Sequence, residues 1–550
     1  MPAAAGDPLL LSHFSVFLYP FRHQLTGGRR LARLEALEPR WLPWPCRHDD
    51  ADLSAALEAT GYFLPYIRGL LYPETRWLRR QCPGENPVEW ARTLRTLCVE
   101  GVGAYARALD ADSVVRLTLR PRPLDALAAF TLQPDRPSHA AEPPLPVRCD
   151  WVDAWLFPTG LGFLLLRLRV DADTPRLAQL IRLNQLFRQV VPGSRSPLSG
   201  RVNLPGGYSC QVRDLMNDLV QGMATPWHVA EADRGGFPAP PVWPTDEPPY
   251  TDSEAGRTFG ERCHLVSYAC ADLADCTPAE LPTGPFPTPA DRIVFELAAC
   301  VGLGESTRNP VWTPAVEQAG RYLRENRIAL WRCWTGMVLK ESLVFLGTED
   351  LPFNRSSLPR QVENDYLPLY LMALFQKLQL IGFSTELMGE VGHGRGRLRG
   401  ARAILQRYVR FRSQFWFSEV TRRPQGGELY RTFQRGLDVG IAHDLVTGSI
   451  KDIKDYYEGV WSRQVGWVKD GMTYLAPPLA GLGVGHVAIR FAVSPWLAVG
   501  GLAGATAALL GLVLGLRRWR KRRRDTGRPA TRTALLRAWW RKDAEPVSSR

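Results

Sequence analysis

Clustered and alternating apolar residues in the first 360 positions predict short β-strands separated by turns. Two apolar runs, Trp151–Phe157 and Gly162–Val170, flank Pro158-Thr159-Gly160-Leu161, a composition typical of a hairpin turn. Ser15–Phe21 and Cys263–Cys270 have the composition of single strands. Strand candidates are therefore spread along the whole front part of the chain.

A second hairpin is expected at Ile328–Trp334 and Ser342–Leu346, with its turn around Thr335-Gly336. The segment Pro289–Cys300 fits either a strand or a helix. Helical spacing of apolar residues predicts helices within three segments, which are Asp50–Leu71, Val88–Leu109 and Thr174–Val191. We therefore expect residues 1–360 to form a mixed regulatory or sensor region, as one unit or as two subdomains.

Long helices are predicted from residue 361 to residue 472. Asn364–Leu387 is apolar on most faces, and Ala401–Arg422 is a second helical segment. Apolar residues then recur every three to five positions, if Gln464 is counted as the one polar member of the series. They are Leu429, Phe433, Leu437, Ile441, Leu445, Ile450, Ile453, Tyr457, Val460, Val468 and Met472. This pattern predicts one helix from Glu428 to Met472, about 68 Å long, although Gly436, Gly440 and Gly448 disfavour it.

Such a stalk has an apolar stripe that other helices must cover. Helices of other copies would cover it in a homo-oligomeric coiled coil. Packing against 364–387 and 401–422 within one chain would cover it equally well.

The stretch from Tyr474 to Leu516 is almost unbroken apolar sequence of 43 residues, too long for one membrane helix and sufficient for two. The first span is expected near Gly471–Ile489 and the second near Val493–Leu516, with Arg490 at the turn. The sequence therefore predicts an α+β cytoplasmic domain, then a long helical stalk, and two C-terminal transmembrane helices within residues 473–516.

Charge sets the expected topology. The chain has a net charge of +13, and residues 517–550 contribute +10 of it. A basic cluster of this kind stays on the cytoplasmic side, so the front domain and the tail should both face the cytoplasm at the inner membrane. A single tail-anchor helix is the alternative. Nucleic-acid binding is not required to explain the charge, because the excess is confined to the tail.

The sequence contains no pattern that favours an enzyme. Its ten cysteines have irregular spacing without a CxxC, as in a reducing compartment, and Cys263-His264, Cys270 and Cys276 are too loosely spaced for a standard zinc site. The glycine-rich segment Gly389–Gly400 matches no phosphate-binding loop spacing. His23, His48, His443, Glu341 and Asp365 stand without a motif partner.

The order of these segments, and the run Trp467–His486 in particular, resembles the CorA-like superfamily of metal-ion transporters over roughly the last 130 residues. The resemblance implies a pentameric homo-oligomer with a pore, and Mg²⁺ or another divalent cation as the transported ion. The family's Gly-Met-Asn motif would fall near Val484-Gly485-His486, where the asparagine is absent. Gly483, Gly485 and His486 are therefore the candidate ion-path residues. A histidine that faces lipid headgroups is the alternative for His486.

The basic cluster is expected to anchor the tail to lipid headgroups, through Arg517, Arg518, Arg520, Lys521, Arg522, Arg523 and Arg524. These features favour an oligomeric cation channel or transporter with a cytoplasmic regulatory domain. A ligand-responsive membrane effector that permeabilises or signals at the membrane is the first alternative, since the front domain is unusually large. A membrane-tethered scaffold is the second.

Overall fold

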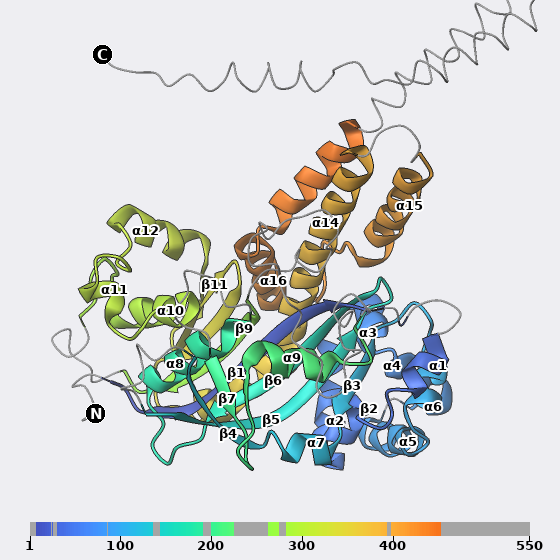
Figure 1. The fold of residues 1–550 in the computed structure, drawn as a ribbon, viewed down its shortest axis with the longest axis horizontal. Coiled ribbons are helices and arrows are strands. Elements are labelled where there is room, and N and C mark those ends of the chain that lie inside the picture. Colours follow the sequence, from blue (N-terminus) through green and yellow to red (C-terminus); the bar gives the residue numbers. More distant parts are fainter. Residues whose placement is uncertain are drawn as a thin grey trace, which may run out of the picture. The chain divides into compact units, whose positions relative to one another are not determined.

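The computed structural model describes residues 7–23, 25, 30–84, 86–135, 143–190, 200–224, 262–273, 282–392 and 398–452, with the side chains of 388–402 excepted. Residues 1–450 form one compact unit. A mixed sheet of twelve strands runs through the described part of this unit (Figure 1). The strands are β1 (Leu10–Arg22), β2 (Trp41–Pro43), β3 (Val115–Leu119), β4 (Ala129–Pro134), β5 (Leu145–Leu156), β6 (Leu161–Val170), β7 (Gly200–Asn203), β8 (Ser209–Gln211), β9 (His264–Ala271), β10 (Arg327–Trp331), β11 (Trp334–Leu339) and β12 (Ser342–Gly347).

The main path of the sheet is β10-β11-β12-β9-β1-β6-β5-β4-β7-β8, and β3 also pairs with β5 and carries β2 at its outer side. Strands β9 and β12 pair in parallel, and the other pairs between these strands are antiparallel. The first strand, β1, lies between β6 and β9. The sheet is therefore built from segments that are far apart in the sequence.

Helices lie between the strands along the chain. Those before β10 are α1 (Arg30–Glu35), η2 (Trp44–Arg47), α2 (Asp50–Ala59), η3 (Thr60–Tyr62), α3 (Pro65–Leu71), α4 (Glu74–Gln81), α5 (Pro87–Val99), α6 (Val102–Ala108), α7 (Pro121–Asp125), α8 (Leu177–Arg188), α9 (Val212–Val220), α10 (Pro289–Ala299), α11 (Glu305–Arg308) and α12 (Val316–Glu325). Those after β12 are the π-helical turn η7 (Phe353–Ser357), α13 (Leu358–Gln361), the π-helical turn η8 (Val362–Tyr366), α14 (Leu367–Gly392), α15 (Leu398–Phe415) and α16 (Pro424–Gly436).

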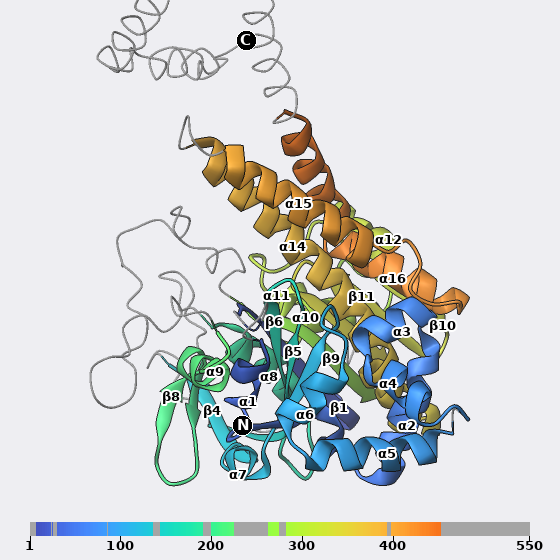
Figure 2. The same ribbon diagram turned by 90° about the vertical axis from the view of Figure 1, so that its right-hand side faces the viewer.

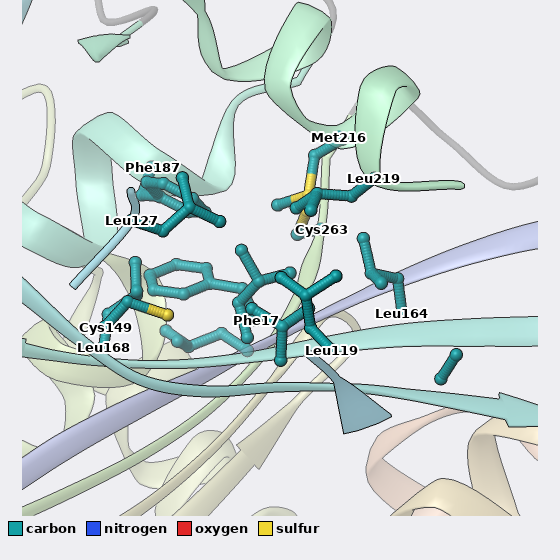
Figure 3. Close-up of a cluster of buried hydrophobic side chains, with 14 of the residues drawn as sticks. Phe17, Leu119, Leu127, Cys149, Leu164, Leu168, Phe187, Met216, Leu219 and Cys263 are labelled. Carbon is teal, nitrogen blue, oxygen red and sulfur yellow. The ribbon is translucent and has the colours of Figure 1, made fainter. Parts of the chain in front are cut away.

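One face of the sheet packs against α8 and α9 (Figure 3). Phe17 of β1 contacts Phe187 of α8 with 4.7 Å between ring centroids. Met216 and Leu219 of α9 join the same cluster. Because these side chains are almost fully buried, they remove a large apolar area from water, which is the main favourable contribution to folding.

The opposite face of the sheet carries α14. Phe375 of α14 stacks on Phe157, which follows β5, with 4.1 Å between ring centroids. The buried amide of Gln376 links α14 to its neighbours, since its Nε2 donates to the carbonyl of Phe415 at 2.8 Å. The Tyr430 hydroxyl and the Gln434 amide of α16 donate to Gln376 Oε1, each at 2.9 Å. Helices α15 and α16 both pack against α14 in this way (Figure 2).

The predicted α+β domain followed by a continuous stalk is wrong. The described residues form an α/β fold on one mixed sheet, in which helices alternate with strands and cover both faces. The strands pair across long sequence separations, which a strand-by-strand reading of the sequence does not reveal. The two membrane spans expected within 473–516 lie outside the described residues.

The single helix expected from Glu428 to Met472 is interrupted. Helix α16 ends at Gly436, and Asp438 adopts a left-handed backbone with φ of 58°. Asp438 pairs there with Lys340, at 3.0 Å, where β11 meets β12. Helical conformation resumes at residue 439 and continues to residue 452, the last described position. Docking of α16 on the sheet therefore outweighs the regular apolar spacing.

The apolar stripe of this segment has two environments. Leu429, Phe433 and Leu437 are buried within the chain. Ile441 and Leu445, beyond the interruption, are each 61% exposed. Packing within one chain thus covers the first part of the stripe.

Several local predictions are confirmed. The hairpin of β5 and β6, the strands β1 and β9, and the amphipathic helix α8 lie where the pattern placed them, and Pro289–Ala299 is a helix. The second predicted hairpin is wrong, because Thr335-Gly336 lies inside β11 and three antiparallel strands occupy 327–347.

Among the described residues, one helical stretch, Phe353–Leu387, is long and apolar enough to cross a membrane. Most of the apolar part of this stretch is buried within the protein, as in a core helix. The side-by-side packing of α14 with the sheet, α15 and α16 accounts for that composition.

Candidate functional site

A β-bulge in β5 shapes the candidate site. Cys149 pairs with Leu168 and Trp151 with Arg167, so Asp150 is an additional residue on β5. A bulge shifts the alternation of side chains by one position. Before it, Cys149 points into the apolar core; after it, Trp151, Asp153 and Trp155 lie on the opposite face, around a small cavity. The bulge therefore places two indoles and a carboxylate at one site.

Arg116 of β3 extends this cluster, since it pairs across the strands with Trp155. Its guanidinium carbon lies 3.7 Å from the ring centroid of Trp44, 4.2 Å from that of Tyr72 and 5.1 Å from that of Trp155. Cations bind to aromatic faces in this geometry, more strongly where water is excluded. Arg116 is only 4% exposed, so the aromatic groups replace much of its hydration.

Glu74, at the start of α4, neutralises Arg116. Its Oε1 accepts from Arg116 Nη2 at 2.7 Å and from the Tyr105 hydroxyl at 2.8 Å, and the Trp44 indole N–H also donates to it. Glu74 is 1% exposed. Removal of either partner of such a buried pair is strongly destabilising, because it leaves an uncompensated charge in the interior.

Arg47, on the 3₁₀ turn η2, forms the next pair. Its Nη1 donates to Asp153 Oδ2 at 2.6 Å, and its guanidinium carbon lies 4.3 Å from the Trp151 ring centroid. The turn begins Trp44-Pro45, and proline suits the first turn of a helix, where a backbone N–H has no partner within the helix. The turn therefore delivers Trp44 and Arg47 to the same face of the sheet.

Glu363 closes the cluster from the C-terminal side. It lies on the π-helical turn η8, an element that is rare and frequent at functional sites. Its Oε1 accepts from Trp151 Nε1 at 3.1 Å and from Arg47 Nη2 at 3.5 Å, and its Oε2 lies 3.4 Å from Arg167 Nε. These distances are at or beyond the long end for charge-assisted contacts. The carboxylate is therefore held by several donors, each of them loosely.

The cavity at the centre has a volume of about 40 Å³. Since one water needs about 10–15 Å³ measured in this way, about three or four waters would fit. Asp153 Oδ1 and His48 Nε2 lie at buried positions in its lining without a hydrogen-bond partner. These two atoms are available to a small polar guest.

The charged groups of the site are balanced. Four guanidiniums face four carboxylates through the ion pairs among Arg47, Arg116, Arg167, Arg169, Glu74, Asp150, Asp153 and Glu363. Burial, and then the nearby arginines, lower the pKa of His48 to about 3. The same causes lower the pKa of His13 to about 4. Both imidazoles are therefore neutral near pH 7 and add no charge.

Asp365, also on η8, gives the site a pH dependence. Burial raises its pKa to about 7, against the lowering effect of Arg423. The folded protein thus holds this proton more tightly than the unfolded chain, so stability should fall as pH rises from about 4 to 7. We expect Asp365→Asn to lack this loss and to be about 1 kcal/mol more stable at pH 8, allowing for partial exposure to solvent. Denaturant unfolding at pH 5 and pH 8 measures the free energy of unfolding of both proteins. An equal change between the two pH values would contradict the raised pKa of Asp365.

The structure does not test the site residues predicted from the sequence. Gly483, Gly485, His486 and the basic residues from Arg517 to Arg524 lie outside the described residues. Among the described residues, no group of three or more His, Cys, Asp and Glu side chains could hold a metal ion. The nine cysteines of that part are free thiols.

Three residues without a motif partner in the sequence have defined places in the fold. His48 lines the cavity, and Asp365 follows Glu363 on η8. Glu341 pairs with Arg188 at 2.5 Å and with Arg262 at 3.5 Å. The sequence signal that was missed is the shift of alternation at Asp150, after which tryptophan, aspartate and tryptophan recur at every second position.

No protein-family model matches the chain, and comparison with curated proteins and with solved structures gives no match.

Proposed function

We propose that the protein is a ligand-responsive effector at a membrane, in which the α/β domain senses a small ligand and the segment 473–516 acts on the lipid bilayer. The observation that carries the proposal is the position of α14. This helix starts at the charged cavity and is tied at its middle to the helices that precede the apolar segment. A change at the cavity can therefore reach them through one rigid element.

The start of α14 belongs to the cavity. Leu367 and Pro368 line it, and Glu363 on the turn directly before α14 contacts Arg47, Trp151 and Arg167. A ligand that binds there more tightly in one arrangement of η8 than in another shifts the population towards that arrangement.

The middle of α14 is coupled to α15 and α16. The buried Gln376 amide makes three hydrogen bonds of 2.8–2.9 Å to Phe415, Tyr430 and Gln434. These buried hydrogen bonds fix the relative positions of the partners, because a shift of any one of them would leave a polar group unsatisfied. Displacement of α14 should therefore displace α16 as well.

The membrane part of the proposal rests on composition. Trp496–Leu516 supplies 21 residues without a charge, and the arginine-rich run from Arg517 follows at once. Such a segment inserts into lipid and keeps its basic flank at the cytoplasmic surface of the inner membrane.

A cation channel or transporter with the same segments is the second candidate. It is supported by the likeness of Trp467–His486 to CorA-like transporters, with Gly483, Gly485 and His486 in the ion path and a divalent cation as cargo. It also needs a homo-oligomer, pentameric if the likeness extends that far. The 61% exposure of Ile441 and Leu445 favours self-association at the helical segment after Asp438.

Vesicle release is the test. The full-length protein is reconstituted into vesicles loaded with Mg²⁺, K⁺ and a quenched organic dye, and release of each is followed by fluorescence. A permeabilising effector should release all three, whereas a selective channel should release cations and retain the dye. A variant without residues 473–516 should release nothing while circular dichroism shows an intact α/β domain. The experiment is repeated with 10 mM phosphate as a small anionic trial ligand. Absence of release by the full-length protein under both conditions would contradict both candidates.

A further inference from the structure

The carboxylate of Glu363 occupies a set of donors that other parts of the chain hold in place. Arg47 comes from η2, Trp151 from β5 and Arg167 from β6. Each arginine has a carboxylate partner of its own, because Arg47 pairs with Asp153 at 2.6 Å and Arg167 pairs with Asp150. Without Glu363 the two arginines keep their own carboxylate partners, and the Trp151 ring keeps its contact with the Arg47 guanidinium. We call Arg47, Trp151 and Arg167 the anion cradle.

We propose that the anion cradle is a binding site for a phosphate-type oxyanion, and that Glu363 occupies it as an internal substitute until the anion displaces it. Two guanidiniums and an indole N–H provide directed donors that match a tetrahedral oxyanion. The Glu363 contacts are 3.1–3.5 Å long. An oxyanion that lies closer to the same donors would form stronger hydrogen bonds and could therefore replace the carboxylate. This assigns a ligand class to the sensing step and rests on the proposed function only for its consequence at the membrane.

The charge of the site favours an anion once Glu363 leaves. Four arginines then face three carboxylates, Glu74, Asp150 and Asp153. The net charge of +1 lies in a largely buried region, where electrostatic attraction is stronger than in water. His13 and His48 do not change this balance, because both are neutral.

Asp153 and the cavity beside the cradle distinguish phosphate from other anions. Asp153 is 5% exposed, and its Oδ1 has no hydrogen-bond partner. A phosphate that is protonated on one oxygen carries an O–H donor as well as acceptors, so it can donate to Asp153 Oδ1 while it accepts from the cradle. Chloride and ionised carboxylates lack that donor.

Displacement of Glu363 would act on η8. The turn loses its contacts to β5, β6 and η2 at once, and α14 begins at the next residue after it. Because a π-helical turn is rare, we expect η8 to rearrange when the contacts of Glu363 are lost. Such a change alters the position of the first turn of α14.

Isothermal titration of the full-length protein in detergent with inorganic phosphate tests the site, against sodium chloride at equal ionic strength. Glu363→Gln keeps the shape of the side chain but removes the competing charge, so we expect it to bind phosphate about tenfold more tightly than the wild type. Glu317→Gln, which makes the same charge change at an exposed position of α12, should bind like the wild type. Trp151→Phe in the Glu363→Gln background keeps an aromatic ring but removes one donor, and should weaken binding about tenfold.

A second titration uses a soluble short-chain phosphatidic acid. Tighter binding than inorganic phosphate would identify a lipid headgroup as the natural source, and equal or weaker binding would identify a free phosphate compound. Circular dichroism confirms that each variant is folded. The proposal is overturned if Glu363→Gln binds phosphate no more tightly than Glu317→Gln. Phosphate binding without vesicle release would leave the cradle intact and refute the membrane function alone.

Discussion

Glu74→Ala should lower the free energy of unfolding by about 3–5 kcal/mol, the largest effect that we expect of any single substitution. Arg116 would remain buried at 4% exposure, with three aromatic rings around it but no negative partner. The Tyr105 hydroxyl would lose its acceptor as well. Denaturant unfolding of the full-length protein, followed by tryptophan fluorescence, measures the loss.

Glu325→Ala is the matched control. Glu325 also pairs with an arginine, Arg321, at 3.0 Å, but both side chains are about half exposed on α12. Exposed pairs of this type contribute less than about 1 kcal/mol. The double variant Glu74→Leu/Arg116→Met should regain part of the loss, since it removes both buried charges. A Glu74→Ala protein as stable as Glu325→Ala would refute the role given to this pair.

Gly436→Ala should destabilise the protein by about 2–3 kcal/mol and loosen α16 from the sheet. A Cβ at this position would lie 2.3 Å from Val338 Cγ1, 2.8 Å from Val338 Cβ and 3.0 Å from the Val338 carbonyl oxygen. Valine is β-branched and stiff, so it cannot swing aside. The backbone of α16 or β11 must move instead. Denaturant unfolding gives the free energy, and hydrogen exchange of the α16 amides reports the loosening.

Gly440→Ala makes the same chemical change four residues later. Nothing lies within 4 Å of a Cβ there, and the residue is exposed in a helical segment. Alanine should therefore stabilise that segment by up to about 1 kcal/mol. Opposite signs for the two variants are the expected result. Equal effects would show that helix propensity, and not contact with Val338, determines the cost at Gly436.

The local elements that the sequence predicts correctly are those with strong turn chemistry. The β5–β6 hairpin has proline and glycine between two apolar runs, and Gly160 has the positive φ of 91° that such a turn uses. The hairpin predicted around Thr335-Gly336 failed for a related reason. Gly336 lies inside β11, where a Cβ would come 2.7 Å from the Val344 carbonyl oxygen. Glycine is required at this position because the strands pack closely. In a single sequence, a glycine needed for close packing cannot be distinguished from a glycine that marks a turn.

The candidate site was beyond sequence reasoning for a different reason. Its residues come from segments near positions 47, 74, 116, 151, 167 and 363, which only the pairing of β3, β5 and β6 and the docking of η8 bring together. The sequence marks His48 only as a histidine without a motif partner. The shift at Asp150 and the hairpin register together could have placed Trp151 opposite Arg167. Nothing in the sequence points to Glu363 as their common partner.

The position of β1 in the sheet has a consequence for synthesis on the ribosome. Its two neighbours are β6 and β9, and β9 in turn needs β12, which ends at Gly347. Strand β1 leaves the exit tunnel long before β9 and β12, so one of its edges stays unpaired until both of those strands have been synthesised, and an exposed edge invites pairing with other chains. A nascent chain of this protein should thus depend on chaperones during translation, and the apolar segment after residue 473 would emerge only when the sheet is already able to close.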